Sequence, residues 1–244
     1  MLFRSVSQSR YFVGDMLEIK RGVGLDKEMR LENFNNLLVL ANSILGSEWV
    51  AFLKSLRYDV RLDDNQYLGF INAPAAKNNH HNYMGGLVVH LMEMWNAFEA
   101  WFPFLTVNGV FDDKETGITK SGVLKGILIH DLHKAWMTFV RKEHGFEYGD
   151  DVSNGLMTND QKSLYLLMEY GVKLTQSEMN VLFNSEGGWA KSPPKYCTPL
   201  AKLVYILDEI SGNVLGRIER KNCLDLYGKK SLDADLLNLT FELF

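Results

Sequence analysis

The stretch from residue 86 to residue 102, GLVVHLMEMWNAFEAWF, decides the fold. Its large apolar residues recur at three- and four-residue intervals, the period of a helix face turned toward a core. The members of this stripe are Leu87, Leu91, Met94, Trp95, Phe98, Trp101 and Phe102. We predict a deeply buried helix that begins at Gly86 and ends before Pro103, because proline removes a helical hydrogen bond.

The rest of the chain repeats this helical period between turn-forming segments. Further helices are predicted over residues 31–56 (one or two helices), 121–140, 160–170, 175–185 and 198–221. A short strand is predicted at 67–71, a surface loop at 106–122 and a hairpin-like excursion at 141–160. The sequence therefore predicts an all-α, mainly helical fold with small irregular or hairpin insertions.

Length and composition indicate one compact domain, since 244 residues can bury a substantial core. We expect a helical lobe over residues 1–79, packed on a core of 80–222 and followed by an extension over 223–244. No secretory signal is visible, so none is expected, and no apolar run reaches the ~18 residues that would suggest a membrane span. The expectation is a soluble, cytoplasmic protein in which Cys197 and Cys223 are buried, reduced thiols.

The charge pattern is close to balanced, with a net charge of −4. A broad basic surface for duplex nucleic acid is not expected. Short basic clusters occur at Arg141-Lys142, Arg217 and Arg220-Lys221; they could contact phosphates or form solvated helix faces. Association into a homo-oligomer stays open.

Four polar residues stand where apolar ones are expected. His90 lies on the core stripe, His130 and Asp131 follow three large apolar residues in GILIHDLHKAW, and Asp208 borders a stripe in LAKLVYILDEISG. Taken singly, each could be a hydrogen-bonded core histidine or a helix-surface carboxylate. Together they would be satisfied by one divalent cation (Mn, Co, Fe, Ni, Zn or Mg), which could activate water and polarise a phosphoryl oxygen.

Three segments resemble the HD-domain metal-dependent phosphohydrolases. HHNYMGGLVVHLMEMWNAF resembles the run up to the first metal histidine in the HD domains of bacterial 3′-to-5′ exoribonucleases. ILIHDLHKAW resembles the family's His-Asp segment, and LAKLVYILDEISGNV resembles its final Asp helix. The resemblance covers about His80 to Gly212, and it implies an HD-domain helical bundle with His90, His130, Asp131 and Asp208 as metal ligands.

The resemblance also implies roles for neighbouring residues. Lys134 matches a lysine that lies near the substrate phosphate or the carboxylates, although a solvated helix lysine is the alternative. His81, and less directly His80, could contact a leaving group or phosphate, or cap a loop. We therefore assign Asp131, Lys134 and His81 as catalytic candidates. The substrate-binding candidates are Lys134, His80, His81, Trp136 and Glu186.

Departures from the family pattern bear on the number of metal ions and on the catalytic residues to be expected. Members with two metals carry additional histidines between the His-Asp pair and the final Asp, whereas after His133 only His144 remains in that interval here, which favours one metal ion. Lys134 stands where the nucleotidase branches place a catalytic Glu, and His133 replaces a common glycine. Asn184 and Ser185 could line the site, and Glu186 is either an outer ligand or base or a solvated loop carboxylate.

The sequence leaves three functions open. The first is hydrolysis of a phosphate ester, anhydride or diester in a nucleotide or another phosphorylated small molecule. The second is a 3′-to-5′ exonuclease acting on single-stranded RNA or DNA. The third is a non-catalytic HD-fold regulator. The aromatics that could stack on a base are Trp136, Phe146, Tyr148 and Trp189, and core packing is expected for at least two of them.

Overall fold

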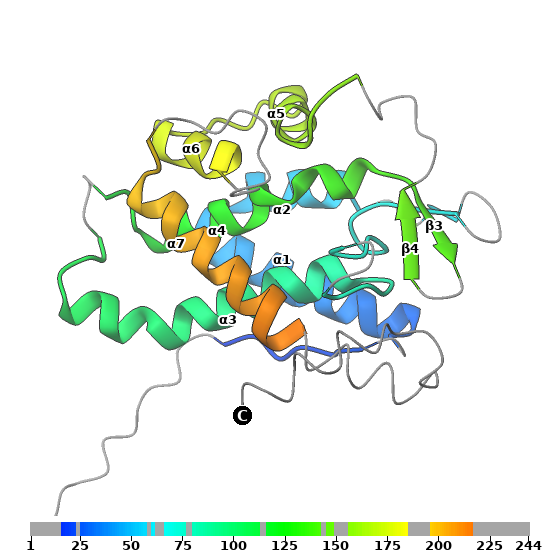
Figure 1. The fold of residues 1–244 in the computed structure, drawn as a ribbon, viewed down its shortest axis with the longest axis horizontal. Helices are drawn as coiled ribbons and strands as arrows, with labels where there is room; N and C mark the ends of the chain where they lie inside the picture. Colours follow the sequence, from blue (N-terminus) through cyan, green and yellow to red (C-terminus); the bar gives the residue numbers. More distant parts are fainter. Residues whose placement is uncertain are drawn as a thin grey trace, which may run out of the picture.

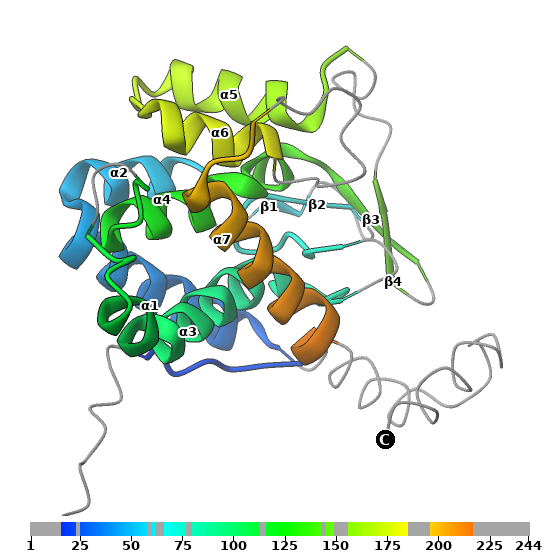
Figure 2. The same ribbon diagram turned by 60° about the vertical axis from the view of Figure 1, so that its left-hand side comes forward.

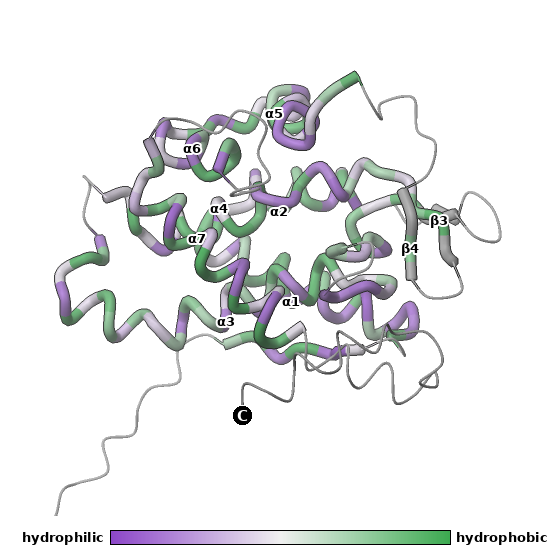
Figure 3. Tube along the Cα trace, viewed as in Figure 1, coloured by the Kyte–Doolittle hydropathy of each residue, from purple (hydrophilic) through white to green (hydrophobic). Residues whose placement is uncertain are grey.

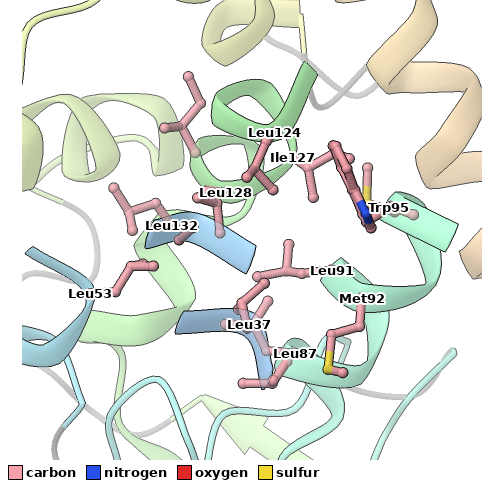
Figure 4. Packing of buried hydrophobic residues seen from close by; sticks show 14 of the residues in the cluster. Leu37, Leu53, Leu87, Leu91, Met92, Trp95, Leu124, Ile127, Leu128 and Leu132 are labelled. Carbon is pink, nitrogen blue, oxygen red and sulfur yellow. The ribbon is translucent and has the colours of Figure 1, made fainter. Parts of the chain in front are cut away.

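Helix α3 (Gly86–Val107) packs against α1, α4 and α7. Its first turns are buried on every side, because Val88, Val89 and Met92 are as inaccessible as Leu87 and Leu91. A helix that is apolar all round belongs inside a protein. In Figure 4, α3 side chains lie among residues from neighbouring helices. The predicted core helix is confirmed.

The structure is a computed structural model that describes residues 16–22, 25–57, 60–61, 66–76, 80–112, 116–142, 145–148, 156–184 and 196–216 (Figure 1). Several predictions concern residues or side chains outside this part of the chain. These are the side chains of Arg141, Lys142 and Tyr148, the residues His144, Ser185, Glu186, Trp189, Arg217, Arg220, Lys221 and Cys223, and the extension 223–244.

The remaining helices lie close to their predicted places, and the described part of the chain is mainly helical. Side chains of Asp26, Thr119, Thr158 and Thr198 accept backbone N–H groups at four helix starts, which fixes where those helices begin. The helices are α1 (Lys27–Leu45), α2 (Ser47–Ser55), α4 (Lys120–His130), α5 (Asn159–Glu169), α6 (Gln176–Asn184) and α7 (Pro199–Glu209).

A small antiparallel sheet lies at one side of the helices (Figure 2). Its strands, in spatial order, are β1 (Val60–Arg61), β2 (Gln66–Leu68), β3 (Phe139–Lys142) and β4 (Gly145–Tyr148). The predicted short strand and hairpin are thus both present. Phe139 pairs with Tyr67 on one side and Tyr148 on the other, so the two predicted insertions form one sheet.

Two predicted helix ends are wrong. The helix expected to reach residue 140 ends at His130, because Asp131 leaves the helical region (φ −115°, ψ 17°) and a 3-10 turn, η1 (Leu132–Trp136), leads into β3. Helix α3 continues through Pro103 to Val107, where the Thr106 hydroxyl donates to the Phe102 carbonyl. The last helix, predicted over 198–221, begins as α7 and continues as a π-helical turn, η3 (Ile210–Leu215), and its predicted end lies outside the described residues.

Two predicted burials are also wrong. Trp101 is 39% exposed because α3 has left the core by that point, where Phe104 and Val107 are exposed too. Cys197 is a free, exposed thiol because it lies in the segment just before the N-cap of α7.

Hydrophilic and hydrophobic residues are interspersed along the helices (Figure 3). Even α3 carries Glu93 and Glu99 among its buried residues. Within the described ranges, no helix combines the length and the apolar character that a membrane span requires.

One hydrophobic cluster extends from Phe34 in α1 to Leu207 in α7, and it includes Leu91 and Leu124. The predicted N-terminal lobe and the predicted core therefore share buried contacts. The proposed division at residue 80 stays a prediction.

Replacement of Leu91 by alanine tests this packing. Leu91 is 1% exposed and faces α1 and α4 side chains in Figure 4, so Leu91→Ala should lower the free energy of unfolding by about 2–5 kcal/mol. Val39→Ala is the control, since Val39 is 71% exposed on α1 and should change stability by about 0.5 kcal/mol or less. Urea denaturation measures both. Equal effects would contradict the packing described here.

Candidate metal centre

Four side chains predicted as ligands converge from three helices. The His90 Nε2 atom lies 3.0 Å from Asp208 Oδ1 and 3.3 Å from His130 Nε2. Asp131 Oδ2 lies 3.4 Å from His130 Nε2 and 3.9 Å from His90 Nε2. Ligand atoms of His90, His130 and Asp131 lie within 4.8 Å of one another and could hold a metal ion.

Close packing of α4 against α7 brings these residues together. A Cβ atom added to Gly126 would lie 2.8 Å from Val204 Cγ2, so glycine is needed for this approach. Gly126 lies one helical turn before His130, and Val204 lies one turn before Asp208. Figures 1 and 2 both show α7 beside α4 and α3. The contact between α4 and α7 therefore places Asp208 beside His90 and His130.

The end of α4 orients His130 and Asp131. The Nδ1–H group of His130 donates to the Ile127 carbonyl at 2.7 Å, because a carbonyl oxygen only accepts. In neutral His130 the lone pair is then on Nε2, which faces the cluster. Asp131 follows in the turn after α4, where its carboxylate contacts Lys134 Nζ on η1.

Burial and neighbouring charges set the ionisation of the carboxylates. Burial alone would raise the pKa of Asp131, but Lys134 and His130 hold it well below its ordinary value. Burial likewise opposes ionisation of Asp208, yet the close contact with His90 leaves its pKa lowered. Both groups are therefore carboxylates at neutral pH.

The pKa values of His90 and His130 are shifted in opposite directions. Burial lowers the pKa of His90, although Asp208 acts against this change. Burial would also lower the pKa of His130, but the nearby Asp131 carboxylate outweighs it and the pKa is raised. In the metal-free protein a proton on His130 would balance part of the negative charge, and a bound cation would take over that role.

This donor set fits a divalent transition metal. Two imidazole nitrogens and two carboxylate oxygens face one small volume, and such mixed donors suit Mn²⁺, Fe²⁺, Co²⁺, Ni²⁺ and Zn²⁺. The Nδ1 atoms are engaged by Ile127 and by Ser211, at 2.7 Å and 2.9 Å, as is usual for histidines that bind metal through Nε2.

His81 and His80 lie behind this centre. His81 is buried, with Nε2 3.0 Å from Glu93 Oε2 and Nδ1 3.1 Å from Nδ1 of His80. Burial, with His90 and His81 nearby, lowers the pKa of His80 to about 2, so this ring is neutral at physiological pH. His80, His81 and His90 also form a group that could hold a metal ion. The group of His90, His130 and Asp131 is the better candidate, because neighbouring side chains already engage both nitrogens of His81.

Lys134 is inside the site. Its side chain is 12% exposed and its Nζ atom contacts Asp131 Oδ2, so it is not a solvated helix lysine. This position is the one the sequence predicted beside the carboxylates. The predicted contact with a substrate phosphate stays a prediction.

The remaining predicted residues are dispersed. Trp136 is half-buried and stacks on Tyr165, with ring centroids 5.4 Å apart and planes 10° apart. Phe146 packs in the core, as expected for some of these aromatics. Asn184 donates to the Asn180 carbonyl within α6. His133 is buried with no hydrogen-bond partner for its ring nitrogens among the described residues, and burial lowers its pKa to about 3.

Sequence reasoning missed three side chains that support His90. Ser211 Oγ lies 2.9 Å from His90 Nδ1 and 2.9 Å from Glu93 Oε2, while the Arg21 Nε group donates to Glu93 Oε1 at 2.7 Å. Glu93 could have been noticed, since it is a charged residue inside the most apolar stretch of the chain. No local signal marks Ser211 or Arg21.

Comparison of the chain with protein-family models, with curated proteins and with solved structures finds no match.

Proposed function

We propose that this protein is a metal-dependent phosphohydrolase of the HD type that acts on a nucleotide-type substrate. One observation carries the proposal: three helices bring His90, the His130–Asp131 pair and Asp208 to one place in the order His, His-Asp, Asp. The same order of these residues in the sequence is the basis of the resemblance to HD-domain phosphohydrolases. Each of the two carboxylates lies within 4 Å of both histidines, which supports a single metal centre.

A divalent cation bound here would supply Lewis acidity toward a phosphoryl oxygen and would activate a water molecule. The protein's own part is to hold the ligands and to balance charge. In hydrolysis, water adds to phosphorus, the bond to the leaving oxygen breaks, and that oxygen takes up a proton. Lys134 keeps Asp131 ionised and places a positive charge beside the centre, which would attract an anionic phosphate.

A nucleotide panel tests this proposal. Protein treated with a chelator and reloaded with Mn²⁺, Co²⁺ or Mg²⁺ is expected to hydrolyse at least one nucleoside mono-, di- or triphosphate or dinucleotide. Labelled single-stranded RNA and DNA oligonucleotides form a second arm, and shortening there alone would identify an exonuclease instead. Absence of any turnover by metal-loaded protein would leave the regulator as the better description.

Lys134→Met is expected to lower kcat/KM about tenfold or more. A hydrogen bond to a charged group contributes about 1.5–3 kcal/mol, and about 1.4 kcal/mol corresponds to a factor of ten. Lys125→Met is the matched control, because Lys125 on α4 is also a partly buried lysine paired with a carboxylate, that of Glu178 at 3.1 Å. Both variants remove a buried pair, but only the first should change hydrolysis. Equal activity of the two would remove Lys134 from the site.

A further inference from the structure

A line of polar contacts runs through the ring of His90. Glu93 Oε2 lies 2.9 Å from Ser211 Oγ, which lies 2.9 Å from His90 Nδ1. On the other side of the ring, His90 Nε2 lies 3.0 Å from Asp208 Oδ1. The line therefore consists of three contacts with a carboxylate at each end.

Neutral His90 cannot satisfy all three contacts. The serine hydroxyl offers one proton and the neutral imidazole offers one, whereas the two carboxylates offer none. Two protons serve three contacts, so one contact has no proton between its atoms. A cation bound at that contact would take the place of the missing proton between the two acceptor atoms.

Burial indicates which contact lacks the proton. The Glu93 side chain is 1% exposed, and Ser211 and His90 are both 0% exposed, so water cannot replace a proton missing from the Glu93–Ser211 or the Ser211–His90 contact. The Asp208 side chain is 24% exposed and can be hydrated. The serine proton is therefore directed to Glu93, the His90 Nδ1 proton is directed to Ser211, and the contact without a proton falls between His90 Nε2 and Asp208.

We infer that Glu93 and Ser211 are positioning residues that hold His90 with Nδ1 protonated and Nε2 free to bind the cation. This inference rests on the metal centre of the proposed function. Neither residue contacts the cation or the substrate. They act through the tautomer and the orientation of the His90 ring, as outer hydrogen-bond partners of metal-binding histidines do.

The surroundings hold both positioning residues in place. Arg21 donates to Glu93 Oε1 at 2.7 Å and His81 lies 3.0 Å from Oε2, so Glu93 is fixed at both oxygens. Ser211 is fully buried in the π-helical turn η3, only three residues after Asp208. A π-helical turn widens the helix locally and often occurs at functional sites. Here it brings Ser211 and Asp208 to opposite nitrogens of the same ring.

Nitrogen-15 NMR of the metal-free protein tests the tautomer directly. At mildly alkaline pH, two-bond correlations to the ring protons should identify His90 as the Nδ1–H tautomer in wild-type protein. Ser211→Ala should shift the Nδ1 resonance and expose its proton to exchange with water. An Nε2–H tautomer in the wild-type protein, or unchanged His90 resonances in Ser211→Ala, would overturn the inference.

Metal affinity supplies the second measurement. Titration with Zn²⁺ and Mn²⁺ alone should show affinity 10–100-fold weaker in Ser211→Ala, and a smaller loss in Glu93→Gln, which keeps the shape but removes the charge. Ser163→Ala is the matched control: Ser163 is an equally buried serine, and its hydroxyl accepts the His133 backbone N–H. Its metal affinity should equal that of wild type.

These measurements separate the two proposals. Wild-type affinity in both Ser211→Ala and Glu93→Gln would overturn the positioning role and leave the metal centre intact. Failure of wild-type protein to bind either metal would overturn the proposed function, and the NMR measurement would still decide the tautomer.

Discussion

Replacing His130 with alanine is expected to lower metal-dependent turnover by about three orders of magnitude. Lewis-acid stabilisation by a metal ion contributes several kcal/mol, and about 1.4 kcal/mol corresponds to a factor of ten. His130 Nε2 lies within 4 Å of His90, Asp131 and Asp208, so its loss removes the ligand at the middle of the cluster. Steady-state hydrolysis under metal saturation measures the change.

Thermal unfolding gives an independent measure of the same variant. A cation that binds only the folded protein stabilises it by about 2.7 kcal/mol at 100 times its Kd. Wild-type protein should therefore show a metal-dependent rise in Tm, and His130→Ala should show almost none. This measurement requires no substrate.

His133→Leu is the matched control for His130→Ala. His133 is another buried histidine, three residues further along, but its ring nitrogens have no hydrogen-bond partner among the described residues. Its replacement should keep both the turnover and the metal-dependent rise in Tm. If His133→Leu lost metal binding as completely as His130→Ala, the ligand assignment would be wrong.

Gly86→Ala is expected to lower the free energy of unfolding by about 3 kcal/mol or more. An added Cβ atom would lie 2.0 Å from the His81 carbonyl oxygen and 2.9 Å from the carbonyl carbon, both backbone atoms. That carbonyl accepts backbone N–H groups from Ala75 and Tyr83, and His81 itself has a positive φ of 48°. The turn before α3 therefore has little freedom to move aside.

Gly109→Ala is the control for this close contact. Gly109 also lies in a turn, with φ at 67°, but nothing lies within 4 Å of an added Cβ atom there. Gly109→Ala should lower the free energy of unfolding by about 1–2 kcal/mol, which is the strain of placing a residue with a side chain in the left-handed region. Chemical denaturation compares the two variants. A Gly86→Ala protein as stable as Gly109→Ala would show that the turn carrying His81 is not fixed against α3.

The side chains of the candidate metal centre were predictable because they carry local signals. His90 follows the apolar period of its helix, and His130 and Asp131 come directly after three apolar residues. A polar group at a core-facing position needs a partner, and this requirement can be recognised without knowing where the partner lies. The spacing of apolar residues along a helix can likewise be recognised from a short stretch of sequence, which explains why most helices lie where they were expected.

Helix ends were less predictable because side-chain contacts and strand pairing, which the apolar period does not encode, decide them. Residues 131–140 continue an apolar pattern, but Asp131 turns toward Lys134 and the metal centre, and Phe139 joins the sheet through Tyr67. The pairing with Tyr67 can compete with helix continuation only once the chain has folded. Pro103 gives the opposite case, since Thr106 supports a turn that a proline was expected to end.

The sequence by itself determined a mainly helical protein with four inward polar residues, because helical period and the cost of burying a polar group are local properties. The tertiary structure decided how those residues are used. Ser211 and Glu93 are 118 positions apart, yet they meet behind His90 at 2.9 Å because α7 packs along α3 and ends in a π-helical turn. Which nitrogen of His90 faces a cation depends on that long-range contact, which no local pattern encodes.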